Sequence, residues 1–236
     1  MNGNTKFLYE QYWHERIKKS KNEVRGEAKL NEIFETASSA LTEGNRILDV
    51  GCGDGSFSHY IKNKFRRLYG AEITKEAAHI AQKQGVFTTI TDLNSSLSYK
   101  VNTFDAVTCL DVIEHLQDPR LLLAEIYRVL RPDGKLVLTT PNFRYFRNLN
   151  KLIFKGGFPH TTPDDFAWRG VHLNYFTRRD LENLLGKAGF ARMRFFINQG
   201  QFRISRKRRL IRLLTGEKTF GEWFCGSITI SAKKEP

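Results

Sequence analysis

The sequence predicts an α/β domain with a doubly wound, mostly parallel sheet, and two observations support this expectation. Segments typical of buried strands alternate with amphipathic helical segments about five times before residue 141. The chain has 236 residues, 40% of them hydrophobic and 27% charged, which suits one large globular domain. Because such alternation arises when right-handed helical crossovers join parallel strands, we expect helices on both faces of the sheet.

The elements of the first 140 residues follow from hydrophobic spacing and from capping residues. The expected strands are 46–50, 68–73, 86–90, 104–110 and 135–140. The expected helices are 26–41, a segment with Phe57, Ile61 and Phe65 on one face, 75–84, and 119–130. Thr74 can cap the third of these helices, Gly85 ends it, and Pro119 stands at the start of the fourth.

The pattern lapses after Pro141 and returns near Phe176. Residues 143–176 are crowded with aromatic side chains, and we expect them to form an insertion folded over the strand ends. A helix follows, with Thr177 as N-cap and Asp180 at the capping-box position. The last strands are expected at 191–197 and 224–232, with a basic stretch at 203–218 between them.

A glycine-rich loop follows the first strand, in the run ILDVGCGDG at 47–55. Glycines at this place let the backbone approach a ligand closely and adopt positive φ. A dinucleotide-binding loop would read G-x-G-x-x-G, with a pyrophosphate over the helix start. This loop is one residue shorter, and Asp49 and Asp54 flank it. Carboxylates here favour a cationic or zwitterionic ligand over a pyrophosphate.

Carboxylates also stand at the ends of the next three strands. Glu72 ends the second strand, and a carboxylate there can accept both hydrogen bonds of a ribose diol. Asp92 follows the third strand and could take an exocyclic amine, and Asp111 follows the fourth. Ligands of doubly wound sheets bind beyond these carboxyl ends, so the strand ends predict the site.

These motifs, taken in order, resemble class I S-adenosylmethionine-dependent methyltransferases, of the branch that includes the ubiquinone-pathway O-methyltransferases. The matching segments are ILDVGCGDG (47–55), GAEI (70–73), TDLN (91–94), FDAVTCLDVIEHLQDP (104–119), EIYRVLRPDGKLVLTTPN (125–142), HLNYFTRRDLENLLGKAGF (172–190) and GSITISAKK (226–234). The resemblance implies a seven-stranded, mostly parallel Rossmann-like methyltransferase sheet with an antiparallel last strand. It also implies one domain over 1–236, with an N-terminal helical cap at 1–43, the aromatic insertion at 143–176 and a basic insertion at 200–222.

The resemblance further implies S-adenosylmethionine as cofactor, with S-adenosylhomocysteine as product, and it assigns roles to residues. The methionine part would contact Asp49, the loop residues and the end of the fourth strand. The ribose hydroxyls would bind Glu72, and the adenine would contact Ile73, Asp92 and Leu93. The implied cofactor-binding residues are Asp49, Gly51, Cys52, Gly53, Glu72, Ile73, Asp92, Leu93, Leu110 and Asp111. The segment 9–16 resembles one that covers the cofactor, and an ordinary amphipathic helix end explains it equally well.

An oxygen acceptor must lose a proton, and histidine is the usual base. His115 and His172 are the candidate catalytic residues, although a structural role for either stays open. Small-RNA 2′-O-methyltransferases carry a related E-x-x-E-H run and a later histidine that hold a divalent metal. Here the run begins with Asp111, a shorter side chain, and Glu114 precedes His115. We therefore expect no metal ligands and keep a metal at these residues as the alternative.

The net charge of +13 bears on the acceptor, since much of it falls in 143–176 and beyond residue 200. We expect methylation, at oxygen, of a small-molecule or lipid- or glycan-linked acceptor. RNA methylation and a noncatalytic, cofactor-binding protein are the alternatives. The stretch 203–218 could contact an anionic membrane or RNA, or be a solvated face. We expect a cytoplasmic protein, on three observations. The number of cysteines is odd, the N-terminus lacks the apolar core of a signal peptide, and no long apolar run is present.

Overall fold

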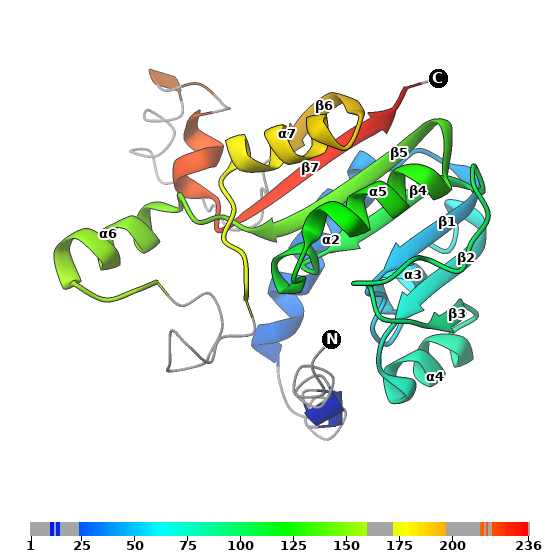
Figure 1. Cartoon of the computed structure of the whole chain (residues 1–236). Helices are drawn as coiled ribbons and strands as arrows, with labels where there is room; N and C mark the ends of the chain where they lie inside the picture. The colour runs from blue at the N-terminus through cyan, green and yellow to red at the C-terminus, as the bar shows by residue number, and fades with distance from the viewer. Residues whose placement is uncertain are drawn as a thin grey trace.

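A seven-stranded sheet forms the centre of the computed structural model, which describes residues 10–11, 13–14, 24–159, 172–196, 213–214, 216 and 219–235. Its strands lie in the order β3-β2-β1-β4-β5-β7-β6 (Figure 1). The strands are β1 (Gly44–Val50), β2 (Phe65–Glu72), β3 (Phe87–Ile90), β4 (Phe104–Leu110), β5 (Leu130–Pro141), β6 (Phe190–Phe196) and β7 (Ser227–Lys234). The first five pair in parallel, and β7 runs antiparallel to β5 and β6. The predicted sheet, with its antiparallel last strand, is confirmed.

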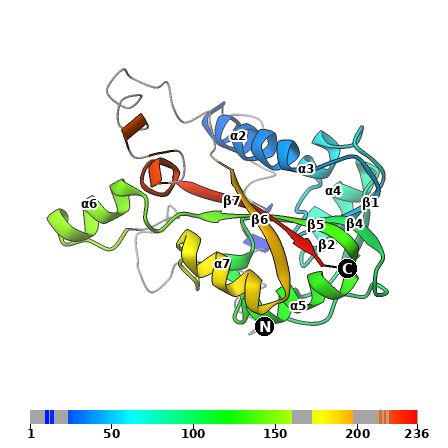
Figure 2. The same ribbon diagram turned by 90° about the horizontal axis from the view of Figure 1, so that it is seen from above.

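Helices cover both faces of this sheet, as Figure 2 shows: α2, α3 and α4 on one face, α5 and α7 on the other. The helices are α2 (Val24–Ala40), α3 (Ser56–Tyr60), α4 (Lys75–Lys83), α5 (Pro119–Val129), α6 (Phe146–Lys155) and α7 (Arg178–Lys187), with a 3₁₀ turn η1 (Ile113–His115). In both views α6 stands apart from the two layers. Among the described residues, no helix is both long and apolar enough to cross a membrane.

Caps fix the ends of the helices that position the strands. Thr177 and Asp180 form the predicted capping box at the start of α7, with reciprocal side-chain and backbone hydrogen bonds. Asp118 accepts a hydrogen bond from the backbone of Arg120 at the start of α5. Thr74 occupies the N-cap position of α4, but its hydroxyl donates to Glu72 at 2.9 Å instead of capping the helix.

The core lies between the sheet and its helices in two clusters. One joins β4, β5 and β7 to the buried faces of α5 and α7, with Leu122, Ile126 and Leu185 fully buried. The other joins α2 and α3 to the opposite face of the sheet. Strands buried on both faces carry nearly continuous apolar runs, and these runs allowed the strands to be predicted from the sequence.

Three expectations about individual elements are wrong. The helix predicted through Phe65 ends at Tyr60, and Phe65 already pairs with Gly44 in the sheet. Phe57 and Phe65 are nevertheless both buried, and their side chains lie in the same hydrophobic cluster. The stretch after Pro141, where no regular pattern was expected, contains α6, a helix of apolar residues, cations and two asparagines. The last strand begins at Ser227, while Phe224 is helical and stacks on Phe220.

Candidate functional site

The glycine-rich loop leaves β1 at the carboxyl edge of the sheet, and its backbone requires glycine. Gly51, Gly53 and Gly55 have φ of 73°, 54° and 82°, in the left-handed region. A Cβ on Gly51 would lie 2.4 Å from a methyl carbon of Val112, and one on Gly53 would lie 2.5 Å from the Trp13 ring. The loop therefore forms a tight bend, with Gly51 partly buried and Gly53 buried against the Trp13 ring.

Asp49, near the end of β1, is a buried carboxylate held by two hydroxyl groups. Ser58 donates to Oδ2 at 3.1 Å, and Thr108 on the neighbouring strand donates to Oδ1 at 2.7 Å. Burial raises the pKa of Asp49 to about 6, although both hydrogen bonds oppose the rise. The carboxylate is thus kept at a cost to folding, a pattern frequent at functional sites.

We expect Asp49→Asn to raise the free energy of unfolding at pH 7, because the ionised carboxylate is destabilising where it is buried. A pKa of about 6 against the ordinary 3.8 corresponds to a cost of about 3 kcal/mol. The native state holds the extra proton between pH 4 and 6, so the wild type gains stability as the pH falls through this window. Denaturant unfolding at pH 7 and pH 4 checks this: the gain should shrink at pH 4, and equal gains would contradict it.

Glu72, at the end of β2, ties the loop to the start of α4. One oxygen accepts a hydrogen bond from the backbone of Gly53 at 3.1 Å. The other accepts from the backbone and the hydroxyl of Thr74, each at 2.9 Å. Glu72 is buried, and these three bonds fix its carboxylate beside the glycine-rich loop and leave about one lone-pair site, on Oε2, for a ligand.

Asp92 and Leu93 follow the end of β3, and Ile73 follows the end of the neighbouring strand β2. Leu93 is buried, whereas Ile73 and Asp92 are half-buried. Burial raises the pKa of Asp92, hydrogen bonds from the backbone and side chain of Asn94 lower it, and the pKa lies below its usual value. Asp92 is therefore an ionised, accessible carboxylate at the same edge as Glu72.

The fourth strand ends in Leu110, and Asp111 follows it with φ of 51°, in the left-handed region. The backbone N–H of Asp111 donates to the hydroxyl of Thr139, which in turn donates to the Asp111 carboxylate at 2.8 Å. Such a conformation costs free energy in a residue with a Cβ and occurs often at functional sites. The strand end is thus fixed with its side chain turned onto β5.

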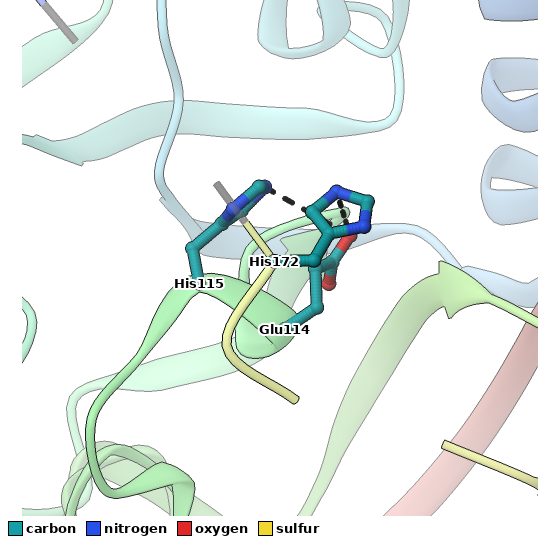
Figure 3. A group of neighbouring side chains, drawn as sticks. All are labelled: Glu114, His115 and His172. Atoms are coloured by element: carbon teal, nitrogen blue, oxygen red, sulfur yellow. Dashed lines mark ion pairs between the residues drawn. The ribbon is translucent and has the colours of Figure 1, made fainter. Parts of the chain in front are cut away.

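Glu114, His115 and His172 come together from two distant segments (Figure 3). The Glu114 carboxylate is 1% exposed, and its Oε1 lies 4.0 Å from Nε2 of each histidine. Its Oε2 accepts a hydrogen bond from the Thr140 hydroxyl at 2.9 Å. The two imidazole rings meet edge to face with centroids 4.6 Å apart.

Backbone hydrogen bonds hold the two segments in this arrangement. The N–H groups of Leu173 and Asn174 donate to the carbonyl of Glu114 at 2.8 and 2.9 Å. The Asn174 side chain donates to the carbonyl of Leu116 at 2.6 Å. His172 is therefore placed opposite His115 by its own neighbours, independently of the imidazole contact.

Both histidines were predicted from the sequence as candidate catalytic residues, and Glu114 was included only in the alternative metal site. The structure places the Glu114 carboxylate against both imidazoles. Ser58 and Thr108, which hold Asp49, carried no distinguishing signal, because their role depends on strand register and on a helix turn. Asp111 does not join the cluster of Glu114 and the histidines.

Comparisons with known proteins agree on one class. A family model described as a methyltransferase domain matches residues 12–193. A ubiquinone biosynthesis O-methyltransferase of Xanthomonas oryzae pv. oryzae is 30% identical over 105 residues, 42% of this chain and 44% of that protein. Its mitochondrial counterpart in Schizosaccharomyces pombe is 32% identical over 120 residues, 47% and 42% of the two chains. The matches thus span less than half of these relatives.

Solved structures share the fold at low identity. A Thermotoga maritima S-adenosylmethionine-dependent methyltransferase, described as a possible histamine N-methyltransferase, gives a TM-score of 0.69 at 18% identity, over 98% of this chain and 100% of that one. Phosphoethanolamine N-methyltransferase 2 of Haemonchus contortus gives 0.59 at 17% identity, over 87% and 53%.

Proposed function

Because the chain belongs to the methyltransferase domain family, we propose that it transfers a methyl group from S-adenosylmethionine to a hydroxyl oxygen of a small-molecule or lipid- or glycan-linked acceptor. The single observation that carries this proposal is the set of carboxylates around a glycine-rich loop at one sheet edge. When bound, the cofactor supplies an electrophilic methyl group on a sulfonium, and the product is S-adenosylhomocysteine.

The residues at the strand ends suit such a cationic cofactor. The bend at Gly51 and Gly53 leaves no room for a Cβ, and its backbone would contact the methionine part. Glu72 would accept hydrogen bonds from the ribose hydroxyls, and Asp92 would meet the adenine amine. Cys52, Ile73, Leu93 and Leu110 would supply apolar contacts, and Asp49 and Asp111 negative charge. Carboxylates in a protein interior attract a cation more strongly than they would in water.

We further propose that one imidazole of the His115 and His172 pair removes the acceptor proton while the other positions it, because both converge on one buried carboxylate. Glu114 would stabilise the imidazolium that forms when a histidine takes the proton. Methyl transfer also needs the acceptor oxygen held in line with the sulfonium methyl, which is an orienting task for the site. We propose an oxygen acceptor in preference to a nitrogen acceptor, because a hydroxyl group must lose its proton to a base such as this histidine pair.

A divalent cation at Glu114, His115 and His172 is the second candidate role for the same cluster. Their ligand atoms all lie within 4.8 Å of one another, and two imidazoles with one carboxylate suit transition metals. A cation there would lower the pKa of an acceptor hydroxyl as a Lewis acid. Asp111 would take no part, since its carboxylate is bound to Thr139.

We expect turnover to persist after chelation, because the proposed base needs no metal. Purified protein would be dialysed against EDTA, assayed, and its metal content measured before and after. Loss of turnover that Mg²⁺, Mn²⁺ or Zn²⁺ restores, with a stoichiometric metal that His172→Ala cannot bind, would assign the cluster to a metal instead.

Two alternatives concern the acceptor and the activity itself. RNA methylation was suggested by the basic stretch 203–218, most of which lies outside the described residues, and a noncatalytic protein would keep only cofactor binding. The cysteines Cys52, Cys109 and Cys225 are buried and form no disulfide, and we propose the cytoplasm as a compartment that suits them.

The experiment supplies S-adenosylmethionine with a labelled methyl group and a panel of phenols, sugars, lipid-linked hydroxyl compounds, amines and transfer RNA. We expect label on a hydroxyl-bearing compound and none on RNA. Label on RNA alone, or only on amines, would contradict the proposed acceptor class. Cofactor binding without any transfer would favour the hypothesis of a noncatalytic, cofactor-binding protein.

A further inference from the structure

Helix α6 exposes large apolar side chains to water. Leu152, Ile153 and Phe154 are 42%, 67% and 79% exposed, and no residue of Phe146–Lys155 is buried. A helix of a globular protein normally buries an apolar stripe against the core. The exposure of three adjacent large apolar side chains on one short helix indicates an interaction surface.

The helix separates its apolar and charged residues onto two sides. At 3.6 residues per turn, Leu149, Ile153 and Phe146 fall on one side, with Leu152 and Phe154 on its borders. The opposite side carries the cations Arg147, Lys151 and Lys155. The helix has no acidic residue, so its charge is of one sign.

The root of α6 is fixed to the body, so the exposed face is held in place. The Phe146 ring lies 5.5 Å from that of Phe224, and the Asn148 side chain donates to the carbonyl of Asn142 at 3.0 Å. Asn142 is buried and donates to two carbonyls before β7, those of Glu222 and Cys225. Beyond this root the helix extends away from the sheet in both views (Figures 1 and 2).

We propose that α6 docks on an anionic lipid membrane, with its apolar side in the acyl boundary and its cations at the phosphates. Amphipathic helices with Lys and Arg on the polar side and Leu or Phe on the other lie in the plane of the interface. Negative lipid headgroups attract such cations, and the overall +13 charge acts in the same direction. RNA would neutralise the cations but leave Leu152, Ile153 and Phe154 in water, so it fits the surface less well.

The test is flotation of the full chain with vesicles of phosphatidylcholine containing 30% phosphatidylglycerol, compared with phosphatidylcholine alone. We expect binding to the anionic vesicles that falls at high salt. The double variant Ile153→Glu/Phe154→Glu should lower the partition coefficient at least tenfold. The matched control is Leu121→Glu, which places a carboxylate at a 54% exposed leucine of α5 and should bind as the wild type does.

Circular dichroism and thermal unfolding would establish that both variants fold, which the lack of buried residues on α6 predicts. Equal binding of the wild type and the α6 double variant would overturn the proposal and shift attention to the stretch 203–218. No binding to anionic vesicles would overturn it as well. The measurement involves no turnover, so its outcome does not depend on the proposed methyl transfer.

Discussion

Replacing Glu72 with alanine should lower the affinity for S-adenosylhomocysteine by about 100-fold or more. The variant would lose the carboxylate proposed to hold the ribose hydroxyls, and hydrogen bonds to charged groups contribute about 1.5–3 kcal/mol each. It would also leave the N–H of Gly53 and the hydroxyl of Thr74 without their acceptor, so the loop itself would loosen. Calorimetric titration measures the affinity directly.

The structure changes how this variant must be controlled. Because Glu72 joins the loop to α4, Glu72→Ala should also lower the free energy of unfolding of the ligand-free protein by about 1–3 kcal/mol. Glu43→Ala removes an exposed carboxylate just before β1, at the opposite edge of the sheet, and should change neither quantity. An unchanged affinity in a folded Glu72→Ala protein would refute the placement of the cofactor.

The second large effect is expected at the histidine pair. Replacing His172 or His115 with alanine should lower kcat by about 10²- to 10⁴-fold, the usual contribution of a general base. The affinity for S-adenosylhomocysteine should stay within about twofold, because the proposed base acts on the acceptor. The assay uses whichever hydroxyl compound the labelled-methyl panel identifies.

A matched control exists on α4, where His79 is exposed and lies outside the cluster. His79→Ala should leave kcat unchanged. If His115→Ala and His172→Ala also retained wild-type kcat while folded, the pair would be structural, and the proton would have to leave by another route.

Much of the fold could be predicted from the sequence because buried parallel strands and capped helices leave local patterns. β4 appears within its predicted bounds, and the capping box of α7 is where Thr177 and Asp180 placed it. The apolar spacing that continued through Phe65 could not separate a helix from a short helix followed by a strand. Helix α6 was missed although its apolar and cationic residues recur at helical spacing, because the aromatic residues of 143–176 were interpreted together as one insertion.

The site could be predicted in outline and not in its contacts. Glycines and carboxylates after successive strands indicate the carboxyl edge, since parallel strands bring their ends together. The partners of Asp49 lie 9 and 59 residues away, and the contact of Glu114 with His172 spans the insertion. Such contacts depend on register and loop path, which a single sequence does not encode locally.

The loop after β1 and the carboxylates around it are proposed to bind S-adenosylmethionine. Titration of the wild-type protein with S-adenosylhomocysteine, with NADH as the competing dinucleotide, tests it most directly. We predict saturable one-to-one binding of S-adenosylhomocysteine that NADH does not displace. Absence of binding, or displacement by NADH at comparable concentration, would contradict it.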